Sequence, residues 1–238
     1  MRREWNPEMA FNAYIDTIRA LHGEGYPQQS GGIPELVGAM AAGWNARMIV
    51  ETYSKGGDDM STSIALSVAR RHTRGRHVCI VPDEETRSQY ASMLGREVKV
   101  EVIVIGDKEA ATMIIDGVDF MVMDRGSGEY GGLPLLSATL SCEGAIFLRK
   151  NLGTRREHEP DREGKGLFGW MKLEGKGCEM KVVRDVYLPV GKGLQVVHVG
   201  SKCGCRGNND PFKEKTTKKR WIKHVDRTTG EEIVIIRR

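Results

Sequence analysis

The chain has 238 residues, of which 39% are hydrophobic and 29% charged, close to the averages of globular domains. This length suits one large domain, and no apolar run approaches the roughly 20 residues of a bilayer span, which excludes a protein with membrane-spanning helices. The formal net charge is +4, and residues 200–238 carry a balance of +6, so the basic excess belongs to the C-terminal end.

Two helices are predicted before the first strand. Asn6-Pro7 offers a cap followed by a residue suited to the first helical turn, and apolar residues from Phe11 to Ile18 recur at the spacing of one helix face. Residues 23–32 are rich in Gly, Pro and Gln, which predicts a flexible link. A second helix is expected from Pro34 to Trp44.

From Arg47 onward, short apolar runs alternate with helical stretches. Continuous apolar strands separated by helices are typical of a parallel sheet covered on both faces, and right-handed crossovers then limit the topology to a doubly wound fold. Ser61 or Thr62 is expected to cap the helix after the first run, and Asp83 the helix after the second. The predicted strands are residues 48–50, 77–81, 98–105, 118–123 and 145–148.

The pattern changes after Asn151. Residues 153–178 carry many charges and glycines, which predicts an exposed loop. Strands 182–190 and 194–199 flank Gly191-Lys192-Gly193, which predicts an antiparallel hairpin at the sheet edge. Five parallel strands finished by such a hairpin are associated with methyltransferases that use S-adenosylmethionine. The predicted fold class is therefore α/β, a Rossmann-like methyltransferase fold whose doubly wound, mainly parallel sheet ends in an antiparallel hairpin.

The chain is predicted to consist of a domain of residues 1–200, whose N-terminal helices span 6–44, and a C-terminal tail. Residues 201–238 form a basic tail, and its two apolar segments predict a terminal hairpin packed on the domain. The run 213–223 joins lysines to Trp221, a combination that can bind phosphates and stack on bases. A nucleic-acid partner therefore stays open beside the alternative of a solvated charge run.

The candidate site lies beyond the carboxyl ends of the strands, where open α/β sheets bind ligands near the reversal of strand order. The loop from Glu51 to Thr62 has adjacent glycines that allow close backbone approach, and it leads into a helix whose free amides attract an anion. An ordinary strand-to-helix turn is the alternative. The candidate residues of this loop are Glu51, Ser54, Gly56, Gly57 and Ser61.

Three further loops are expected at the same edge. Asp83 could accept hydrogen bonds from ribose hydroxyls, cap its helix, or do both. Gly106 and Asp107 follow the third strand, and Asp124 to Gly128 follow the fourth. A simple turn is an alternative for each of these last two loops.

Several segments carry a resemblance to a known family. They are ELVGAMAAGWNA at 35–46, IVET at 49–52, GRHVCIVP at 75–82, IDGVDF at 115–120, LPVGKGL at 188–194 and RWIKH at 220–224. In these segments, and over nearly its whole length, the chain resembles a plant family of methyltransferase-like proteins, a domain of unknown function numbered 1442. The resemblance implies the fold but no substrate, because the family has no assigned reaction.

More distantly, the chain resembles the metal-dependent catechol and caffeoyl-CoA O-methyltransferases. Glu51 matches the acid that opens their glycine-rich loop, and Ser61-Thr62 matches the start of their next helix. The loop here is longer, and Tyr53 stands where they place a glycine. Those enzymes ligate a divalent cation through an aspartate after strand four and an Asp-Asn pair after strand five, where this chain has Asp124 and Lys150-Asn151.

Lys150 therefore argues against a metal site, because an ammonium has no lone pair for a hard cation and repels it. We expect no metal here, and none at Cys203-Gly204-Cys205 with His198, which falls one ligand short of a closed zinc site. Lys150 could instead act as a general base, or it could be a solvated lysine at a strand end.

Together these features predict a protein that binds S-adenosylmethionine and methylates the oxygen or nitrogen of a small molecule. The alternative is a catalytically inactive scaffold, or a nucleic-acid-binding module acting through the basic tail. An odd number of cysteines and an N-terminus without an apolar leader favour the cytoplasm, with the nucleus as an alternative and no membrane partner. The predicted cofactor-binding residues are Glu51, Ser54, Gly56, Gly57, Ser61, Asp83, Gly106, Asp107 and Asp124. The predicted catalytic residues are Asp124, Lys150 and Asn151, which with Arg125 are expected to form the floor of the acceptor pocket.

Overall fold

The computed structural model of the chain forms two compact units, Met1–Cys205 and Arg206–Arg238. The first contains four helices among its described residues, and the second a pair of strands. The structure describes residues 4–23, 32–53, 60–94, 99–104, 115–124, 138–152, 174–175, 178–201, 220–225 and 232–237.

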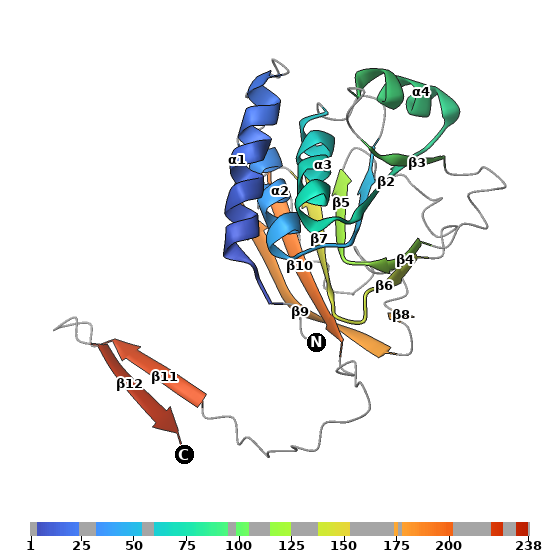
Figure 1. The fold of residues 1–238 in the computed structure, drawn as a ribbon. Coiled ribbons are helices and arrows are strands. Elements are labelled where there is room, and N and C mark those ends of the chain that lie inside the picture. The colour runs from blue at the N-terminus through green and yellow to red at the C-terminus, as the bar shows by residue number, and fades with distance from the viewer. Residues whose placement is uncertain are drawn as a thin grey trace. The chain divides into compact units, whose positions relative to one another are not determined.

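Seven strands form the central sheet of the first unit, in the order β3-β2-β1-β5-β7-β10-β9 (Figure 1). The first five are parallel, and β10 runs antiparallel to both of its neighbours. This order, with its reversal between β1 and β5, confirms the predicted Rossmann-like methyltransferase fold. The strands are β1 (Met48–Thr52), β2 (Arg76–Val81), β3 (Glu101–Val104), β5 (Phe120–Asp124), β7 (Ala145–Lys150), β9 (Cys178–Leu188) and β10 (Leu194–Ser201).

Three short strands extend the sheet beyond β9 and were not predicted. They are β8 (Glu174–Gly175), β6 (Ala138–Leu140) and β4 (Ile115–Val118), in that order. The predicted hairpin forms, but its strand β9 is not a bare edge, because Cys178 and Glu179 pair with β8. The strand predicted over 118–123 forms as β5, but it begins at Phe120, and Val118 instead ends the separate strand β4.

Asp119 explains that interruption. Its side chain is buried, and Oδ2 accepts hydrogen bonds from the backbone N–H groups of Arg47 at 2.7 Å and Met48 at 2.9 Å. The backbone N–H of Asp119 in turn donates to the carbonyl of Met48. The residue thus satisfies backbone groups at the entrance of β1 instead of continuing one strand.

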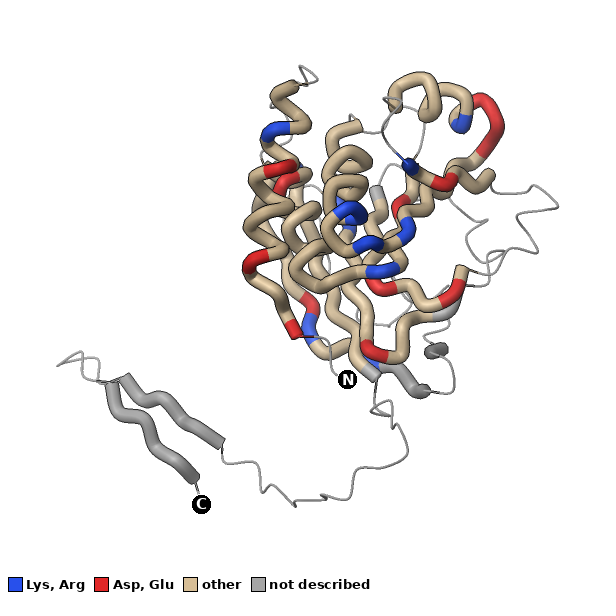
Figure 2. Tube along the Cα trace, viewed as in Figure 1, with Lys and Arg blue, Asp and Glu red and all other residues tan. Residues whose placement is uncertain are grey.

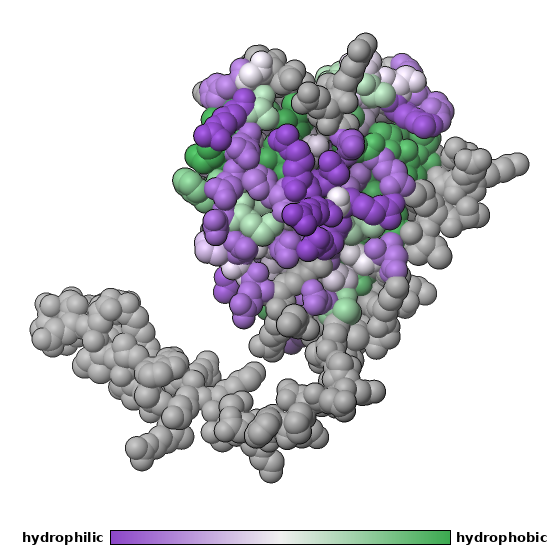
Figure 3. All heavy atoms as spheres, viewed as in Figure 1, coloured by the Kyte–Doolittle hydropathy of each residue, from purple (hydrophilic) through white to green (hydrophobic). Residues whose placement is uncertain are grey.

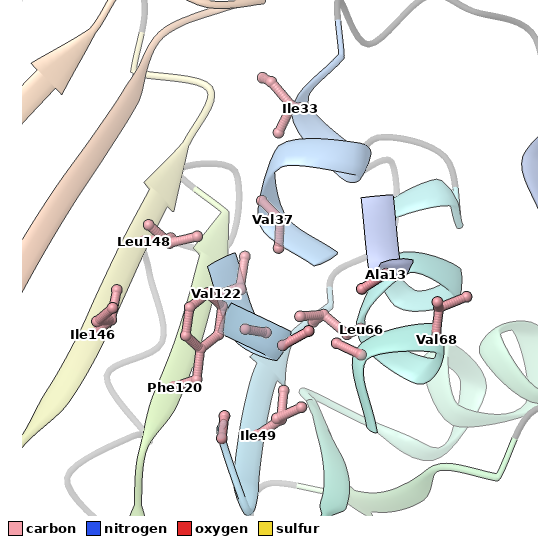
Figure 4. Packing of buried hydrophobic residues seen from close by; sticks show 14 of the residues in the cluster. Ala13, Ile33, Val37, Ile49, Leu66, Val68, Phe120, Val122, Ile146 and Leu148 are labelled. Carbon is pink, nitrogen blue, oxygen red and sulfur yellow. The ribbon is translucent and has the colours of Figure 1, made fainter. Parts of the chain in front are cut away.

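Helices α1 (Pro7–Gly23), α2 (Ile33–Gly43) and α3 (Ser61–Thr73) lie together over one face of the sheet (Figure 1). Apolar residues that alternate along β1, β5 and β7 meet apolar residues of these helices in one buried cluster (Figure 4). Burial of each such side chain stabilises the fold by about 1.5–3 kcal/mol. The labelled members are Ala13, Ile33, Val37, Ile49, Leu66, Val68, Phe120, Val122, Ile146 and Leu148.

Gly38 lets the three helices approach closely. A Cβ at this position would lie 2.9 Å from Oγ1 of Thr17 on α1 and 3.1 Å from the carbonyl oxygen of Ala65 on α3. Both distances are shorter than ordinary van der Waals contact. The helix layer therefore depends on a residue without a side chain here.

Two predicted helix caps form and one does not. Asn6 Oδ1 accepts from the N–H of Met9 at 2.9 Å, and Asp83 Oδ1 accepts from the N–H of Thr86 at 2.7 Å at the start of α4 (Glu84–Met93). For α3, the expected cap at Ser61 or Thr62 is wrong, because Met60 occupies the cap position without a side-chain hydrogen bond. Ser61 and Thr62 are buried residues of the helix itself.

Charged residues lie along the outer sides of the helices (Figure 2). Arg70 and Arg71 stand in the last turn of α3, where the helix dipole favours positive charge. The same face seen as spheres is largely hydrophilic, with apolar residues gathered at its sides (Figure 3). The large hydrophobic side chains that are exposed include Phe11 and Tyr14 of α1.

The second unit contains strands β11 (Arg220–Val225) and β12 (Glu232–Arg237), which pair antiparallel with Trp221 opposite Ile236. The packing of this hairpin on the larger unit stays a prediction. Across the ranges given above, the helices include none that is both long and apolar enough to cross a bilayer.

Candidate functional site

The carboxyl ends of β1, β2, β5 and β7 lie along one edge of the sheet, because these strands are parallel neighbours. The strand order reverses between β1 and β5, which is where open α/β sheets bind ligands. The described candidates that this edge brings together are Glu51 and Ser61 around β1, Asp83 after β2, Asp124 at the end of β5, and Lys150 and Asn151 at the end of β7.

Glu51 is almost fully buried and contacts polar side chains of three other elements. Its Oε1 accepts a hydrogen bond from the hydroxyl of Tyr90 on α4 at 2.7 Å, and its Oε2 accepts one from the hydroxyl of Ser63 on α3 at 3.0 Å. Nε2 of His77 on β2 lies 3.0 Å from Oε1. One carboxylate therefore joins β1, β2, α3 and α4.

The surroundings keep this carboxylate ionised. Burial works to raise the pKa of Glu51, but the electrostatic attraction of His77 and the hydrogen bonds from Tyr90 and Ser63 outweigh it and hold the pKa below its ordinary value. Burial, with the charge of Glu51 beside it, raises the pKa of Tyr90 and of Cys79 well above their usual ranges. Cys79 is thus a protonated thiol at neutral pH, which excludes it as a nucleophile.

Tyr53 packs next to this cluster. Its ring meets that of Tyr90 edge to face, with centroids 5.0 Å apart, and its hydroxyl lies 3.8 Å from Sδ of Met93. Burial, together with the charge of Glu51, raises the pKa of Tyr53. The side chain of Tyr53 is therefore directed toward α4.

Lys150 ends β7 and has a side chain that is 7% exposed. It follows Leu148 on the helix-covered face, and its Nζ donates a hydrogen bond to Oγ1 of Thr62 at 3.2 Å. This contact connects the end of β7 with the first turn of α3, although the residues are 88 positions apart in the chain. Asn151 follows with φ of 63°, a left-handed conformation that asparagine tolerates.

The first turn of α3 thus lies between a carboxylate and an ammonium group. Ser61, Thr62 and Ser63 are all buried; Ser63 donates to Glu51, and Thr62 accepts from Lys150. The partial positive charge of a helix N-terminus favours an anion at this place. The arrangement can hold an anionic group next to α3.

The remaining predicted residues are less defined. Asp83 caps α4, one of its two expected roles, and its contact with a ribose stays a prediction. Only the backbone of Asp124 is described, and it is the Cα partner of Lys150. The candidates Ser54, Gly56, Gly57, Gly106, Asp107 and Arg125 lie outside the described residues.

Sequence reasoning missed Ser63, His77 and Tyr90. A signal for two of them was present, since His77 opens an otherwise apolar predicted strand and Ser63 stands among the apolar residues of α3. Polar residues inside buried segments need partners. Nothing in the sequence indicated Tyr90, because its partnership depends on how α4 packs.

The residues at this edge do not fit a divalent cation. Lys150, the register partner of Asp124 and the residue before Asn151, carries an ammonium, which donates hydrogen bonds and offers no lone pair. Within the part of the chain that the structure describes, no group of three or more His, Cys, Asp or Glu is arranged to hold a metal ion. His198, considered above for zinc, packs against the ring of Trp44 instead, with centroids 5.0 Å apart.

Comparison with known proteins gives one family match. The family described as "Protein of unknown function (DUF1442)" matches residues 1–237. No curated protein sequence matches the chain.

Three solved structures illustrate the likeness of fold. A methyltransferase from Geobacter sulfurreducens is 19% identical, with 79% of this chain and 88% of that chain covered and a TM-score of 0.43. The methyltransferase PaMTH1 of Podospora anserina, solved bound to SAH, is 15% identical over 84% and 90% of the two chains, with a TM-score of 0.47. A putative caffeoyl-CoA O-methyltransferase from Staphylococcus aureus is 12% identical over 79% and 92%, with a TM-score of 0.43. Because these identities and TM-scores are low, the fold assignment rests on the strand order of the sheet.

Proposed function

Because the chain belongs to the DUF1442 family, whose description assigns no activity, we propose a function from the site itself: the protein binds S-adenosylmethionine and methylates a small molecule. The observation that carries this proposal is the strand order, whose reversal between β1 and β5 gives a ligand site above the carboxyl ends of the strands. The contact of Lys150 with Thr62 supports it, because it brings the end of β7 to the same place.

The methyl donor would lie between α3 and the cap of α4. Its carboxylate would meet the N-terminal turn of α3 near Ser61, and its ribose hydroxyls would meet the carboxylate of Asp83. Ser54, Gly56, Gly57, Gly106 and Asp107, together with Asp124, are assigned to the same ligand from the sequence.

Glu51 has a different role in this proposal. Both of its carboxylate oxygens already accept hydrogen bonds, from Tyr90 and from Ser63. It would therefore act as a positioning residue that fixes the starts of α3 and α4 on either side of the donor. A contact between Glu51 and the donor would use only the acceptor capacity that these bonds leave.

The acceptor would lie above the ends of β5 and β7, next to Asp124, Lys150 and Asn151. A sulfonium donor carries a reactive methyl group when bound, so the protein chiefly has to align the acceptor with it and exclude water. Lys150, which is buried and held by its hydrogen bond to Thr62, suits the alignment of an acceptor away from water. No contact of the described residues favours the alternative of an inactive scaffold or a nucleic-acid-binding module.

The proposal is tested by calorimetric titration of the whole protein with S-adenosylmethionine and S-adenosylhomocysteine, with ATP as the control ligand. We expect binding of both in the micromolar range and none of ATP. A ligand at 100 times its Kd stabilises a protein by about 2.7 kcal/mol, so thermal unfolding provides a second measurement. The absence of heat and of thermal stabilisation at saturating concentrations would refute the proposal.

A further inference from the structure

The position of Lys150 in the sheet is the starting point of this inference. Strands β5 and β7 are parallel neighbours whose last paired residues are Asp124 and Lys150. Neighbouring strands lie about 4.8 Å apart, so both positions belong to the same small area of the edge. These are the positions at which the resemblance to metal-dependent O-methyltransferases implies metal ligands.

The environment of Lys150 disfavours a second cation. Its side chain is 93% shielded from solvent, and its ammonium donates to Thr62 in the first turn of α3. The N-terminal end of a helix carries partial positive charge. A buried ammonium and a helix N-terminus therefore act together at one place, and both attract an anion and repel a metal ion.

We propose that Lys150 supplies the positive charge that a metal ion supplies in the metal-dependent enzymes, so that this protein methylates an oxygen acceptor without a metal. This inference rests on the proposed function. The acceptor hydroxyl loses its proton to solvent, and the resulting oxyanion is held by the ammonium of Lys150. The oxyanion forms a bond to the methyl carbon while the carbon–sulfur bond breaks, and the electron pair stays on sulfur, giving S-adenosylhomocysteine.

The charge of Lys150 also selects the class of acceptor. An acidic hydroxyl, such as that of a phenol, becomes an anion that an ammonium stabilises. A neutral amine gains no such stabilisation, and a protonated amine is repelled. The inference therefore favours O-methylation over N-methylation.

The first experiment measures metal binding and needs no methyl transfer. Binding of Mn²⁺ is followed by electron paramagnetic resonance for the wild type, Lys150→Asp and the matched control Lys150→Met. We expect binding only to Lys150→Asp, which places carboxylate or amide oxygens at positions 124, 150 and 151. Binding by the wild type, or none by folded Lys150→Asp, overturns the inference. If Lys150→Asp does not fold, the Mn²⁺ measurement on the wild type decides whether the inference stands.

The second experiment measures transfer to phenols of graded acidity and to matched anilines, with and without EDTA. We expect transfer to phenols that EDTA leaves unchanged and that falls about 10²- to 10³-fold in Lys150→Met, the usual effect of removing one group that stabilises an oxyanion. Lys150→Arg keeps the charge and should retain more activity than Lys150→Met. Transfer only to anilines, loss of transfer in EDTA, or unchanged transfer by Lys150→Met overturns the inference.

The two proposals fail in different ways. If S-adenosylhomocysteine does not bind, the proposed function fails, whatever the metal measurements show. If S-adenosylhomocysteine binds and the wild type also binds Mn²⁺, only the inference about Lys150 fails. If neither phenols nor anilines are methylated, Mn²⁺ binding alone decides whether the inference about Lys150 stands.

Discussion

Replacing Glu51 by glutamine tests whether its carboxylate holds β1, β2, α3 and α4 together. The variant keeps the shape of the side chain but converts one acceptor oxygen into an NH₂ donor. That group would face either the hydroxyl of Ser63 or the pair formed by Tyr90 and His77, which now meet Oε2 and Oε1. At least one of these partners loses its acceptor, and the attraction of the charge for His77 is lost.

The magnitude follows from burial. Hydrogen bonds to a charged group contribute about 1.5–3 kcal/mol each, and a buried donor left without an acceptor costs about 1–3 kcal/mol. We expect Glu51→Gln to lower the free energy of unfolding at pH 7 by about 3–5 kcal/mol. The assay is urea unfolding of both proteins. A matched control is Glu84→Gln, whose exposed ion pair with Arg87 predicts a change below about 1 kcal/mol.

The pH dependence gives a second check. The pKa of Glu51 in the folded protein lies below its ordinary value of 4.5. Its contribution to stability is therefore fully present above pH 4.5 and is lost as pH falls through the folded pKa. The difference between wild type and Glu51→Gln should shrink in that range. A loss below about 1 kcal/mol at pH 7, or a difference independent of pH, would refute the reasoning.

Three further predictions concern the scaffold. Asp119→Ala leaves the N–H groups of Arg47 and Met48 without their acceptor, so denaturant unfolding should show a free energy of unfolding lower by about 2–5 kcal/mol. A decrease below about 1 kcal/mol would contradict the role of Asp119. Gly38→Val forces a side chain against Thr17 and Ala65 and should lower the free energy of unfolding by about 1–3 kcal/mol or more in the same assay. The control Gly23→Ala, where a Cβ meets nothing within 4 Å, should leave it unchanged. Equal effects of the two variants would contradict the close packing of the helices. Cys79 should resist iodoacetamide at pH 8 in the folded protein, because it is buried and its pKa is raised, while Cys142 should react faster. The labelling of each cysteine is measured by peptide mapping with mass spectrometry. Equal labelling of the two would contradict the burial of Cys79.

The sheet could be predicted from the sequence because its strands carry a strong local signal. Residues 48–50, 78–81 and 145–148 are continuous apolar runs, a pattern typical of buried parallel strands. The short strand β4 escaped prediction because Asp119 interrupts the pattern to bind the backbone of Arg47 and Met48. That contact is set by tertiary structure.

The candidate site was only partly predictable for the same reason. Glu51 and Lys150 stood out as polar residues at the ends of apolar strands. Their partners are distant in the chain, Tyr90 39 positions from Glu51 and Thr62 88 positions from Lys150. Such pairs depend on strand register and on the packing of α3 and α4, which a single sequence does not specify.

The cofactor proposal is tested most directly by a crystal structure of the protein grown with S-adenosylhomocysteine. The account predicts a nucleoside above the carboxyl ends of β1 and β2, with the amino-acid carboxylate at the first turn of α3 and the ribose at Asp83. A nucleoside bound elsewhere, or crystals free of it at saturating concentration, would contradict the account.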